Sequence, residues 1–587
     1  MCGIFGIAKY SSTEKLSSFE IQKSRDACNT LYHRGPDDYG EWIADNIYLG
    51  HRRLSILDLS EQGRQPMIAA NGSVAIAVNG EIYNFRQLRK DLGEHKFQSV
   101  SDSEVILHGY LAWGLEKLMA RLEGMFAFSV VDRRNGIVYL ARDHAGIKPL
   151  YYGQIAGYIF WTSELKGVKT FFDPSHLQID KTALYDFLTY RYIPSPKSLY
   201  LGCKKLEPGH FAEIDLYTGE SRTRRYWDVF TEEKSLSVNE AGEQIRQLMG
   251  TSVEEQMVSD VPLGFFLSGG IDSSIVVAEA AARHDALASF AIGYDVATHD
   301  ETNYADVVAK HFRTRHTKRV LTADHADDLV ARMEDWYDEP FADTSALPTW
   351  HLSRLARENV TVVLTGDGAD ELFGGYRWYE RYARFRKLQS FLLPGLKHGP
   401  RTSLAARSAG LARKFASRVD LLTRRDPLEL YATLLTGYIG PEKKHYHRVL
   451  EIEDDYDDMW HFRRHYRPEL SIRKRMQYLD FHTYLPDDIL TKVDRATMDV
   501  SLEARVPFLS RPLIELAFSL PQHVLYHQGQ LKSALKHAYR DVLPQKILNR
   551  GKKGFSIPLH QWDSSTGENA LLIQDRIAAR YLACNEA

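Results

Sequence analysis

The residues with the clearest potential for chemistry form one short stretch, Leu267-Ser268-Gly269-Gly270-Ile271-Asp272-Ser273-Ser274. An apolar run over 261–267 precedes it and a helix-like run over 274–282 follows, which predicts a strand-to-helix turn. Such a turn binds phosphate, because glycine lets backbone N–H groups approach an anion and the helix presents its positive end. Asp272 alone would repel phosphate, so we expect a divalent cation between them.

Other phosphate and nucleophile motifs do not fit this stretch. The chain has no G-x-x-x-x-G-K-[ST], Phe266 stands where a nucleophile elbow needs glycine, and no G-x-G-x-x-G opens the helix. The stretch resembles the SGG-[LI]-DSS loop of the ATP pyrophosphatase superfamily, which cleaves ATP between the α- and β-phosphates to adenylate a substrate. A merely structural Gly/Ser-rich turn would be favoured if the loop stood alone.

A second candidate is Cys2, at the start of an apolar stretch over 1–8 that is typical of a buried strand. The initiator methionine is normally removed before a small residue, which would leave Cys2 with a thiol and a free α-amine on adjacent atoms. The amine has a reference pKa of about 7.7–8.0, so it can take the thiol proton and leave a nucleophilic thiolate. Without companion motifs, a small buried cysteine would be the better interpretation.

Several polar motifs follow Cys2 along the chain. Gly35-Pro36 indicates a turn, Asn79-Gly80 predicts a tight turn, and Ser101 to Glu104 has capping-box spacing. Between these motifs we expect strands over 74–78, 125–132 and 137–142 and helices over 85–92 and 105–113. This mixture predicts a sandwich of sheets with helices.

Together these motifs resemble the class II glutamine amidotransferase domain, an N-terminal-nucleophile αββα fold that hydrolyses glutamine to glutamate and ammonia. The resemblance implies that Cys2 attacks the side-chain amide and that Asn79 and the Gly80 N–H form the oxyanion hole. It also implies a charged glutamine-binding set around Asn79, namely Arg53 for the α-carboxylate and Glu81 and Asp102 for the α-ammonium. As structural alternatives, Arg53 is a surface cation and Asp102 a helix cap.

The C-terminal two-thirds alternate helix and strand patterns. A helix is expected over 238–257, strands over 288–293 and 360–365, and hence a doubly wound parallel α/β sheet. Ligands bind such sheets at the carboxyl ends of the strands. Directly after the last of these strands comes Gly366-Asp367-Gly368-Ala369-Asp370-Glu371, whose oxygen ligands suit Mg²⁺ better than a core. A purely structural acidic turn is the alternative.

These motifs, followed by others over 484–495, 501–509 and 549–555, resemble the synthetase domain of glutamine-hydrolysing asparagine synthetases. The resemblance implies that ammonia passes internally from Cys2 to an aspartyl-adenylate. It implies Mg²⁺ on Asp272 and Asp370, acyl-adenylate formation at Asp367, and phosphate charge steadied by Lys552. The implied ATP-binding set is Leu267, Ser268, Gly269, Gly270, Asp272, Ser273, Ser274, Ile292, Thr365 and Gly366.

Two departures leave the amide acceptor open. Asp367 replaces the glutamate of the best-known members, and residues 338–345 lack the Thr-Thr and Arg pattern that some members use to hold aspartate. We expect glutamine and aspartate as substrates; the alternative keeps both half-reactions with a sugar or cell-envelope carboxylate. A catalytically silent binding protein is a third hypothesis, against which the joint presence of Cys2, Asn79, Asp272 and Asp370 speaks.

Composition sets the remaining expectations. The 587 residues are 44% apolar and 26% charged with a formal charge of −3, which is typical of a soluble multidomain protein and argues against general nucleic-acid binding. Four dispersed cysteines form no zinc or disulfide pattern, and no apolar run reaches the roughly 20 residues of a membrane span. We therefore expect a cytoplasmic protein without a transmembrane segment; the sequence leaves a homodimer open.

The expected domains are the amidotransferase over 1–205, a linker over 206–236, the synthetase over 237–560 and a tail of unknown role over 561–587. One basic segment, 401–425, belongs to no motif. A packed helix with a solvated basic face is the preferred interpretation, and contact with an anionic membrane or a phosphorylated acceptor is the alternative.

Overall fold

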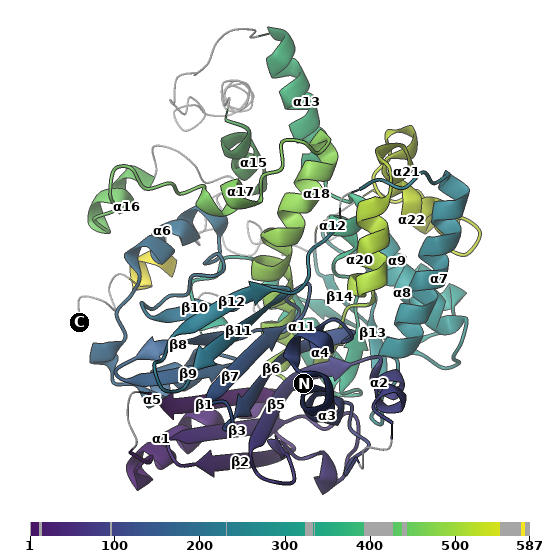
Figure 1. The fold of residues 1–587 in the computed structure, drawn as a ribbon. Helices are drawn as coiled ribbons and strands as arrows, with labels where there is room; N and C mark the ends of the chain where they lie inside the picture. Colours follow the sequence, from purple (N-terminus) through teal and green to yellow (C-terminus); the bar gives the residue numbers. More distant parts are fainter. Residues whose placement is uncertain are drawn as a thin grey trace.

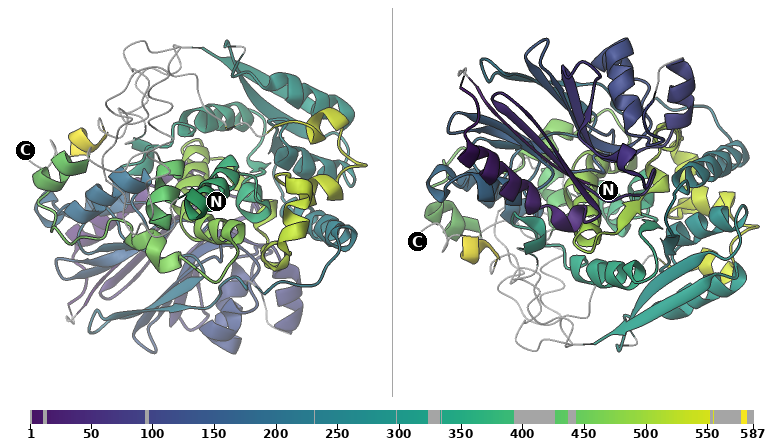
Figure 2. Two further views of the ribbon diagram at one scale, coloured as in Figure 1. Left: turned by 90° about the horizontal axis from the view of Figure 1, so that it is seen from above. Right: turned by 90° about the horizontal axis from the view of Figure 1, so that it is seen from below.

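The computed structural model describes residues 2–10, 14–93, 97–230, 232–296, 298–322, 333, 335–392, 426–436, 443–551, 554 and 577–581. Lys552, the basic segment 401–425 and most of the tail lie outside the described residues. Two antiparallel sheets occupy the N-terminal part and a parallel sheet with many helices the C-terminal part (Figure 1). In Figure 2, the green segment that contains helix α18 (Ile472–His482) lies between the purple and blue strands and the teal strands.

The N-terminal part is built from two six-stranded sheets. The first has the order β10-β8-β9-β1-β3-β2 and the second β12-β11-β7-β6-β5-β4. Their strands are β1 (Gly3–Lys9), β2 (Asp38–Ala44), β3 (Ile47–Arg53), β4 (Met67–Ile68), β5 (Val74–Ile82), β6 (Gly124–Asp132), β7 (Ile137–Arg142), β8 (Tyr151–Ile155), β9 (Tyr158–Thr162), β10 (Cys203–Lys205), β11 (His210–Asp215) and β12 (Ser221–Arg225).

Helices cover the outer face of each sheet. The first sheet carries α1 (Ser18–Asn29) and α5 (Lys166–Phe171), and the second carries α2 (Phe85–Asp91), α3 (Glu104–Trp113) and α4 (Leu115–Met119). Strand β1 is apolar from Gly3 to Ala8 because both of its faces are buried there: Ile4 and Ala8 face the second sheet, whereas Phe5 and Ile7 face α1. The predicted αββα sandwich is therefore confirmed.

Three local predictions in this part were wrong. Strand β5 runs through Asn79 and Gly80, which pair with β6 and form no turn. Ser101 does not cap α3, because the Glu104 carboxylate instead accepts hydrogen bonds from the backbone of residues 98 and 99 in the preceding loop. Strands β11 and β12 lie in the expected linker; β12 is exposed at every position, so it lacks a buried-strand pattern.

The C-terminal part contains a five-stranded parallel sheet. Its strands are β13 (Leu263–Phe266), β14 (Ala288–Tyr294), β15 (Arg315–Leu321), β16 (Val362–Leu364) and β17 (Glu503–Arg505) in the order β15-β14-β13-β16-β17. Alternate strand residues enter two separate cores, with Ala291 and Leu364 on one face and Ile292 and Val363 on the other. The predicted doubly wound sheet is confirmed: from β13 the chain adds β14 and β15 on one side and then returns to add β16 and β17 on the other.

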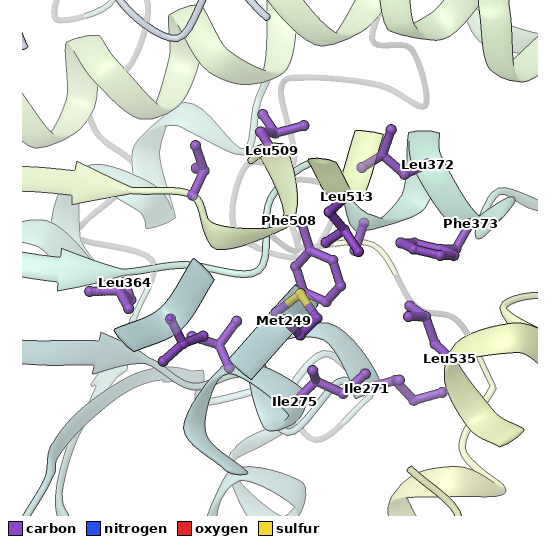
Figure 3. Close-up of a cluster of buried hydrophobic side chains, with 14 of the residues drawn as sticks. Met249, Ile271, Ile275, Leu364, Leu372, Phe373, Phe508, Leu509, Leu513 and Leu535 are labelled. Atoms are coloured by element: carbon purple, nitrogen blue, oxygen red, sulfur yellow. The ribbon is translucent and has the colours of Figure 1, made fainter. Parts of the chain in front are cut away.

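Helices pack on both faces of this sheet. They are α7 (Val238–Gln256), α8 (Ile271–Ala281), α9 (Thr302–His311), α11 (Ala346–Arg357), α12 (Ala369–Phe373), α19 (Thr491–Met498), α20 (Arg511–Ser519), α21 (Gln522–Leu525), α22 (Ser533–Ala538) and α23 (Gln545–Leu548). Figure 3 shows the core beneath the phosphate loop, where Phe508 lies beside Met249 and above Ile275. This packing fixes the start of α8 against the sheet.

A second group of helices stands over the junction of the two parts (Figure 1). It consists of α6 (Lys181–Tyr190), α13 (Arg377–Leu392), α15 (Pro427–Leu435), α16 (Lys444–Val449), α17 (Trp460–His465) and α18 (Ile472–His482). None of the helices in the described ranges combines the length and the apolar character that crossing a bilayer requires.

Candidate active sites

Cys2 lies directly before β1 and is buried, with a relative exposure of 6%. Its backbone N–H donates a hydrogen bond of 3.0 Å to Asn79 Oδ1, and its carbonyl accepts one of 3.1 Å from Arg34 Nε. Burial raises the pKa of the Cys2 thiol. The backbone of the expected nucleophile is thus held from both sides.

Asn79 and Gly80 lie side by side in β5, next to Cys2. The Asn79 side chain is fully buried, and its Nδ2 has no hydrogen-bond partner among the described residues. Gly80 has a positive φ of 153°, and a Cβ here would lie 2.0 Å from the carbonyl oxygen of Met125, so a side chain does not fit. A buried donor without a partner beside a nucleophile is suited to stabilise an oxyanion.

Two buried carboxyl groups lie beyond this donor. Asp102 accepts a 2.6 Å hydrogen bond from the Ile82 N–H, yet burial raises its pKa to about 6. Burial, together with the negative charge of Asp102, raises the pKa of Glu81 well above its usual range. A bound ammonium group would favour the ionised form of both, so this pocket is suited to an amino group.

Arg53 ends β3 and is held by the loop that follows. Its guanidinium donates to the carbonyls of Leu57 at 3.1 Å and Ser60 at 3.0 Å, and also to that of Asp58. It lines a cavity of about 480 Å³ together with Ser55. The loop carbonyls fix the direction of the guanidinium.

The C-terminal part contacts the carboxyl groups of the first site through strand β17. Arg505 Nη2 lies 3.5 Å from Glu81 Oε1, and Arg505 Nε lies 2.6 Å from Glu503 Oε1. Both β17 residues are almost fully buried. Glu503 and Arg505 belong to the motif over 501–509, but no local pattern in the sequence indicated that this segment contacts Glu81.

The second site is a cavity of about 800 Å³ at the carboxyl ends of β13 and β16, which is the point where the strand order of the sheet switches. Seven residues of the expected ATP-binding set line it, namely Leu267, Ser268, Asp272, Ser273, Ile292, Thr365 and Gly366. Asp367 and Asp370 line it as well. The structure therefore brings together two loops that are far apart in the sequence.

The phosphate loop has the geometry of an anion site. Gly269 has a φ of 67°, and a Cβ here would lie 2.3 Å from the backbone of Tyr304. Gly270 caps α8 without a side-chain hydrogen bond, which leaves the helix N-terminus open to a ligand. The Ser274 hydroxyl donates to the Gly270 carbonyl at 2.6 Å and is fully buried, so it supports the loop from beneath.

Lys532 joins the two carboxylates expected to hold a metal. Its Nζ lies 2.6 Å from an oxygen of Asp272 and 2.6 Å from an oxygen of Asp370. The described residues contain no group of three or more His, Cys, Asp or Glu side chains suited to a metal. Two converging carboxylates still fit Mg²⁺, which often takes one or two protein carboxylates and completes its shell with phosphate oxygens and water.

The far end of the cavity carries charges of both signs. Asp367 Oδ2 accepts a 2.7 Å hydrogen bond from the Thr365 hydroxyl, and Lys492 Nζ lies 3.0 Å from Asp343 Oδ2. Burial opposes ionisation of Asp343, but the charge of Lys492 and the hydrogen bonds from Ser345 together outweigh it and lower the pKa of Asp343 to about 2. Arg191 lines the same end.

Sequence reasoning missed several of these groups. Lys532 stands outside every motif, and nothing in its spacing marks it. Lys492 and Arg34 lie within motifs that the sequence shows, but their partners Asp343 and Asp494 are far away in the chain, so no local pattern indicates these contacts. Lys552 lies outside the described residues.

Comparison with known proteins finds a matching family for each part of the chain. Residues 244–583 match the family model described as asparagine synthase, and residues 1–227 match the one described as glutamine amidotransferase domain. The chain is 32% identical over 582 residues to asparagine synthetase [glutamine-hydrolyzing] 1 of Bacillus subtilis, covering 96% of this chain and 88% of that protein.

Two further similarities differ in weight. A putative asparagine synthetase [glutamine-hydrolyzing] 2 of Methanocaldococcus jannaschii is 35% identical over 526 residues, covering 85% of this chain and 98% of that protein. Among solved structures, the glutamine phosphoribosylpyrophosphate amidotransferase of B. subtilis has a TM-score of 0.30 and 15% identity, covering 62% of this chain and 81% of that one. The latter likeness is too weak to carry an argument.

Proposed function

The chain belongs to the asparagine synthase family, and from this membership we propose that it makes asparagine from aspartate, ATP and glutamine. The observation that carries the proposal is the pair of sites in one chain. A buried cysteine with a free amide donor stands in one part, and a phosphate loop facing two carboxylates stands in the other.

In the first site, Cys2 would attack the side-chain amide of glutamine. Once Met1 is removed, the α-amine of Cys2 would stand where its backbone nitrogen now donates to Asn79, and it would take the thiol proton and pass it to the leaving ammonia. Water would then hydrolyse the resulting thioester, which releases glutamate and restores the Cys2 thiol. Asn79 Nδ2 and the Gly80 N–H would stabilise the oxyanion of the tetrahedral intermediate. Glu81 and Asp102 would hold the α-ammonium, and Arg53 the α-carboxylate.

In the second site, a carboxylate oxygen of aspartate would attack the α-phosphorus of ATP and release pyrophosphate. The Ser268–Ser274 loop would bind the phosphates with the open N-terminus of α8. Asp272 and Asp370 would hold Mg²⁺, which when bound neutralises phosphate charge. Ammonia would then displace AMP from the acyl group, and Asp367, which lines the same cavity, would accept the proton that ammonia loses.

Aspartate is the acceptor that best fits the charges at the end of the cavity. Lys492 and Arg191 can pair with its carboxylates, and Asp343 can accept from its ammonium. Asp343 lies in the segment over 338–345 that departs from the Thr-Thr and Arg pattern, whereas Lys492 and Arg191 come from other parts of the chain.

The test is pyrophosphate release from ATP in the presence of Mg²⁺ and glutamine, with aspartate and without it. We expect release that depends on aspartate, with asparagine formed in equal amount. Glutamine hydrolysis without aspartate-dependent pyrophosphate would contradict the proposed acceptor and direct the search to larger carboxylates. Absence of both activities would contradict the proposal as a whole.

A further inference from the structure

Arg34 connects the nucleophile of the first site to the C-terminal part of the chain. Its side chain is fully buried, and its Nε donates to the Cys2 carbonyl at 3.1 Å. Its Nη1 donates to Glu164 Oε1 at 2.7 Å. The remaining acceptor of the guanidinium comes from a residue 460 positions later.

That residue is Asp494, in helix α19. Asp494 Oδ2 accepts from Arg34 Nη1 at 2.8 Å, and Oδ1 accepts from Arg34 Nη2 at 3.1 Å. Such a two-pronged contact fixes the plane of the guanidinium as well as its position. Because Nε points at Cys2 from the same rigid plane, the direction of the Cys2 contact depends on Asp494.

Helix α19 is itself held firmly between the two sites. Lys492 and Val493 line the ATP cavity, and Lys492 pairs with Asp343. On the other side of the helix, Arg495 Nη1 lies 2.8 Å from Glu164 Oε2 and 3.3 Å from Asp338 Oδ2. One short helix thus contacts both the ATP cavity and the support of the nucleophile.

We infer that Asp494 is a positioning residue for glutamine hydrolysis: supplied by the synthetase part, it orients Arg34 and through it the backbone of Cys2. The inference rests on the proposed glutaminase activity of Cys2. Within the described part of the chain, the Asp494 carboxylate contacts Arg34 and, at 3.8 Å, Lys148 Nζ. It forms no hydrogen bond or ion pair there with the expected glutamine-binding residues Arg53, Glu81 and Asp102. Its role should therefore appear in turnover and leave glutamine binding intact.

The test is Asp494→Asn in the full-length enzyme. The Asp494 carboxylate accepts two hydrogen bonds from Arg34, whereas an amide has only one oxygen to accept them. The plane of the Arg34 guanidinium is therefore no longer fixed. Since a misplacement of about 1 Å can cost about 10²-fold in rate, we expect kcat for glutamine hydrolysis to fall about 10²-fold with KM for glutamine within about twofold. Alkylation of Cys2 by iodoacetamide should also change in rate, while ammonia-dependent pyrophosphate release remains.

The matched control is Asp499→Asn, directly after the last residue of the same helix. Within the described part of the chain, the Asp499 carboxylate accepts one hydrogen bond, of 2.7 Å from the Trp350 indole N–H. An amide oxygen can accept that bond equally well, so neither activity should change. As a second variant, Arg34→Lys removes the Nε donor to Cys2 and should give the same separation of kcat from KM.

Unchanged glutamine turnover in Asp494→Asn would overturn the inference. So would a parallel loss of ammonia-dependent synthesis or a lowered melting temperature with both activities reduced, because that result indicates a general structural role. If the unaltered enzyme itself fails to hydrolyse glutamine, the proposed function fails first, which separates the two outcomes.

Discussion

The two sites differ in how their buried polar and charged groups are compensated. In the glutamine site, Asn79 Nδ2 has no hydrogen-bond partner within the described part of the chain, and burial keeps the pKa of Glu81 and Asp102 raised. In the ATP cavity, three carboxylates are already paired with lysines, since Lys532 lies between Asp272 and Asp370 and Lys492 lies beside Asp343. In the first site, a bound ligand would supply partners for the buried polar groups, whereas in the second site lysines already offset the carboxylate charge.

This difference follows from what each site would bind. A single small zwitterion can satisfy a few buried groups at once, so such a site can be nearly closed and dry. Nucleotide phosphates bring negative charge into a cavity that already contains carboxylates, so lysines and a divalent cation are needed to offset it. The two sites should consequently respond independently to substitution.

The largest expected effect is that of Cys2→Ala. Loss of the nucleophile should lower glutamine-dependent synthesis by on the order of 10⁴-fold or more, while synthesis with added ammonium continues. Both rates are measured as pyrophosphate released. Cys28→Ala is the matched control, because this buried cysteine packs against Phe5 and Ile7 away from the site. Loss of the ammonia-dependent rate in Cys2→Ala would contradict two separate sites.

Lys532→Ala should act on the other site alone. Without its ammonium, Asp272 and Asp370 would repel each other and the phosphates, so we expect ATP-dependent pyrophosphate release to fall about 10²–10³-fold. Glutamine hydrolysis should stay within about twofold. Lys536→Ala, one turn further along α22, provides the comparison. Equal effects of the two substitutions would show that the position of Lys532 between the carboxylates is unimportant.

Asn79→Asp separates the two contacts of this side chain. The substitution keeps an oxygen for the Cys2 N–H but removes the Nδ2 donor, so kcat for glutamine hydrolysis should fall about 10²–10³-fold. The control is Asn84→Asp, which loses a 2.8 Å bond to the Arg121 carbonyl at the surface. A rise in KM with unchanged kcat would mean that Asn79 binds ground-state glutamine rather than the oxyanion.

The smallest expected effect is one of pH on glutamine binding. Because the pKa of Asp102 is raised to about 6, the carboxyl is protonated below that pH and cannot pair with an ammonium. Glutamine should therefore bind Cys2→Ala about tenfold more weakly at pH 5 than at pH 7, and binding near pH 6 should release protons. Calorimetry in buffers of different ionisation enthalpy measures both, and Asp102→Asn should remove most of the pH dependence.

Much of the architecture could be predicted because its signals are local. The capped amphipathic run over 238–257 became α7, and residues 137–142 became β7 with the expected limits. Motif order indicated both the sandwich and the doubly wound sheet. Local patterns suffice where the burial of a segment repeats along its own length.

Other features depend on contacts that no local pattern contains. Strand β17 is three residues long and two of them are charged, yet it is buried because Arg505 pairs with Glu503 and Glu81. The Asn79-Gly80 pair resembles a turn, but its pairing with β6 continues the strand. Lys532 and Asp494 acquire their partners only when distant segments pack together.

The most direct test of two sites acting on one nitrogen uses glutamine labelled with ¹⁵N in its side-chain amide. The enzyme is given this glutamine together with aspartate, ATP and Mg²⁺, and the products are analysed by mass spectrometry. The account predicts asparagine that carries the label, formed in equal amount with glutamate, AMP and pyrophosphate. Labelled ammonia and glutamate without labelled asparagine would contradict it.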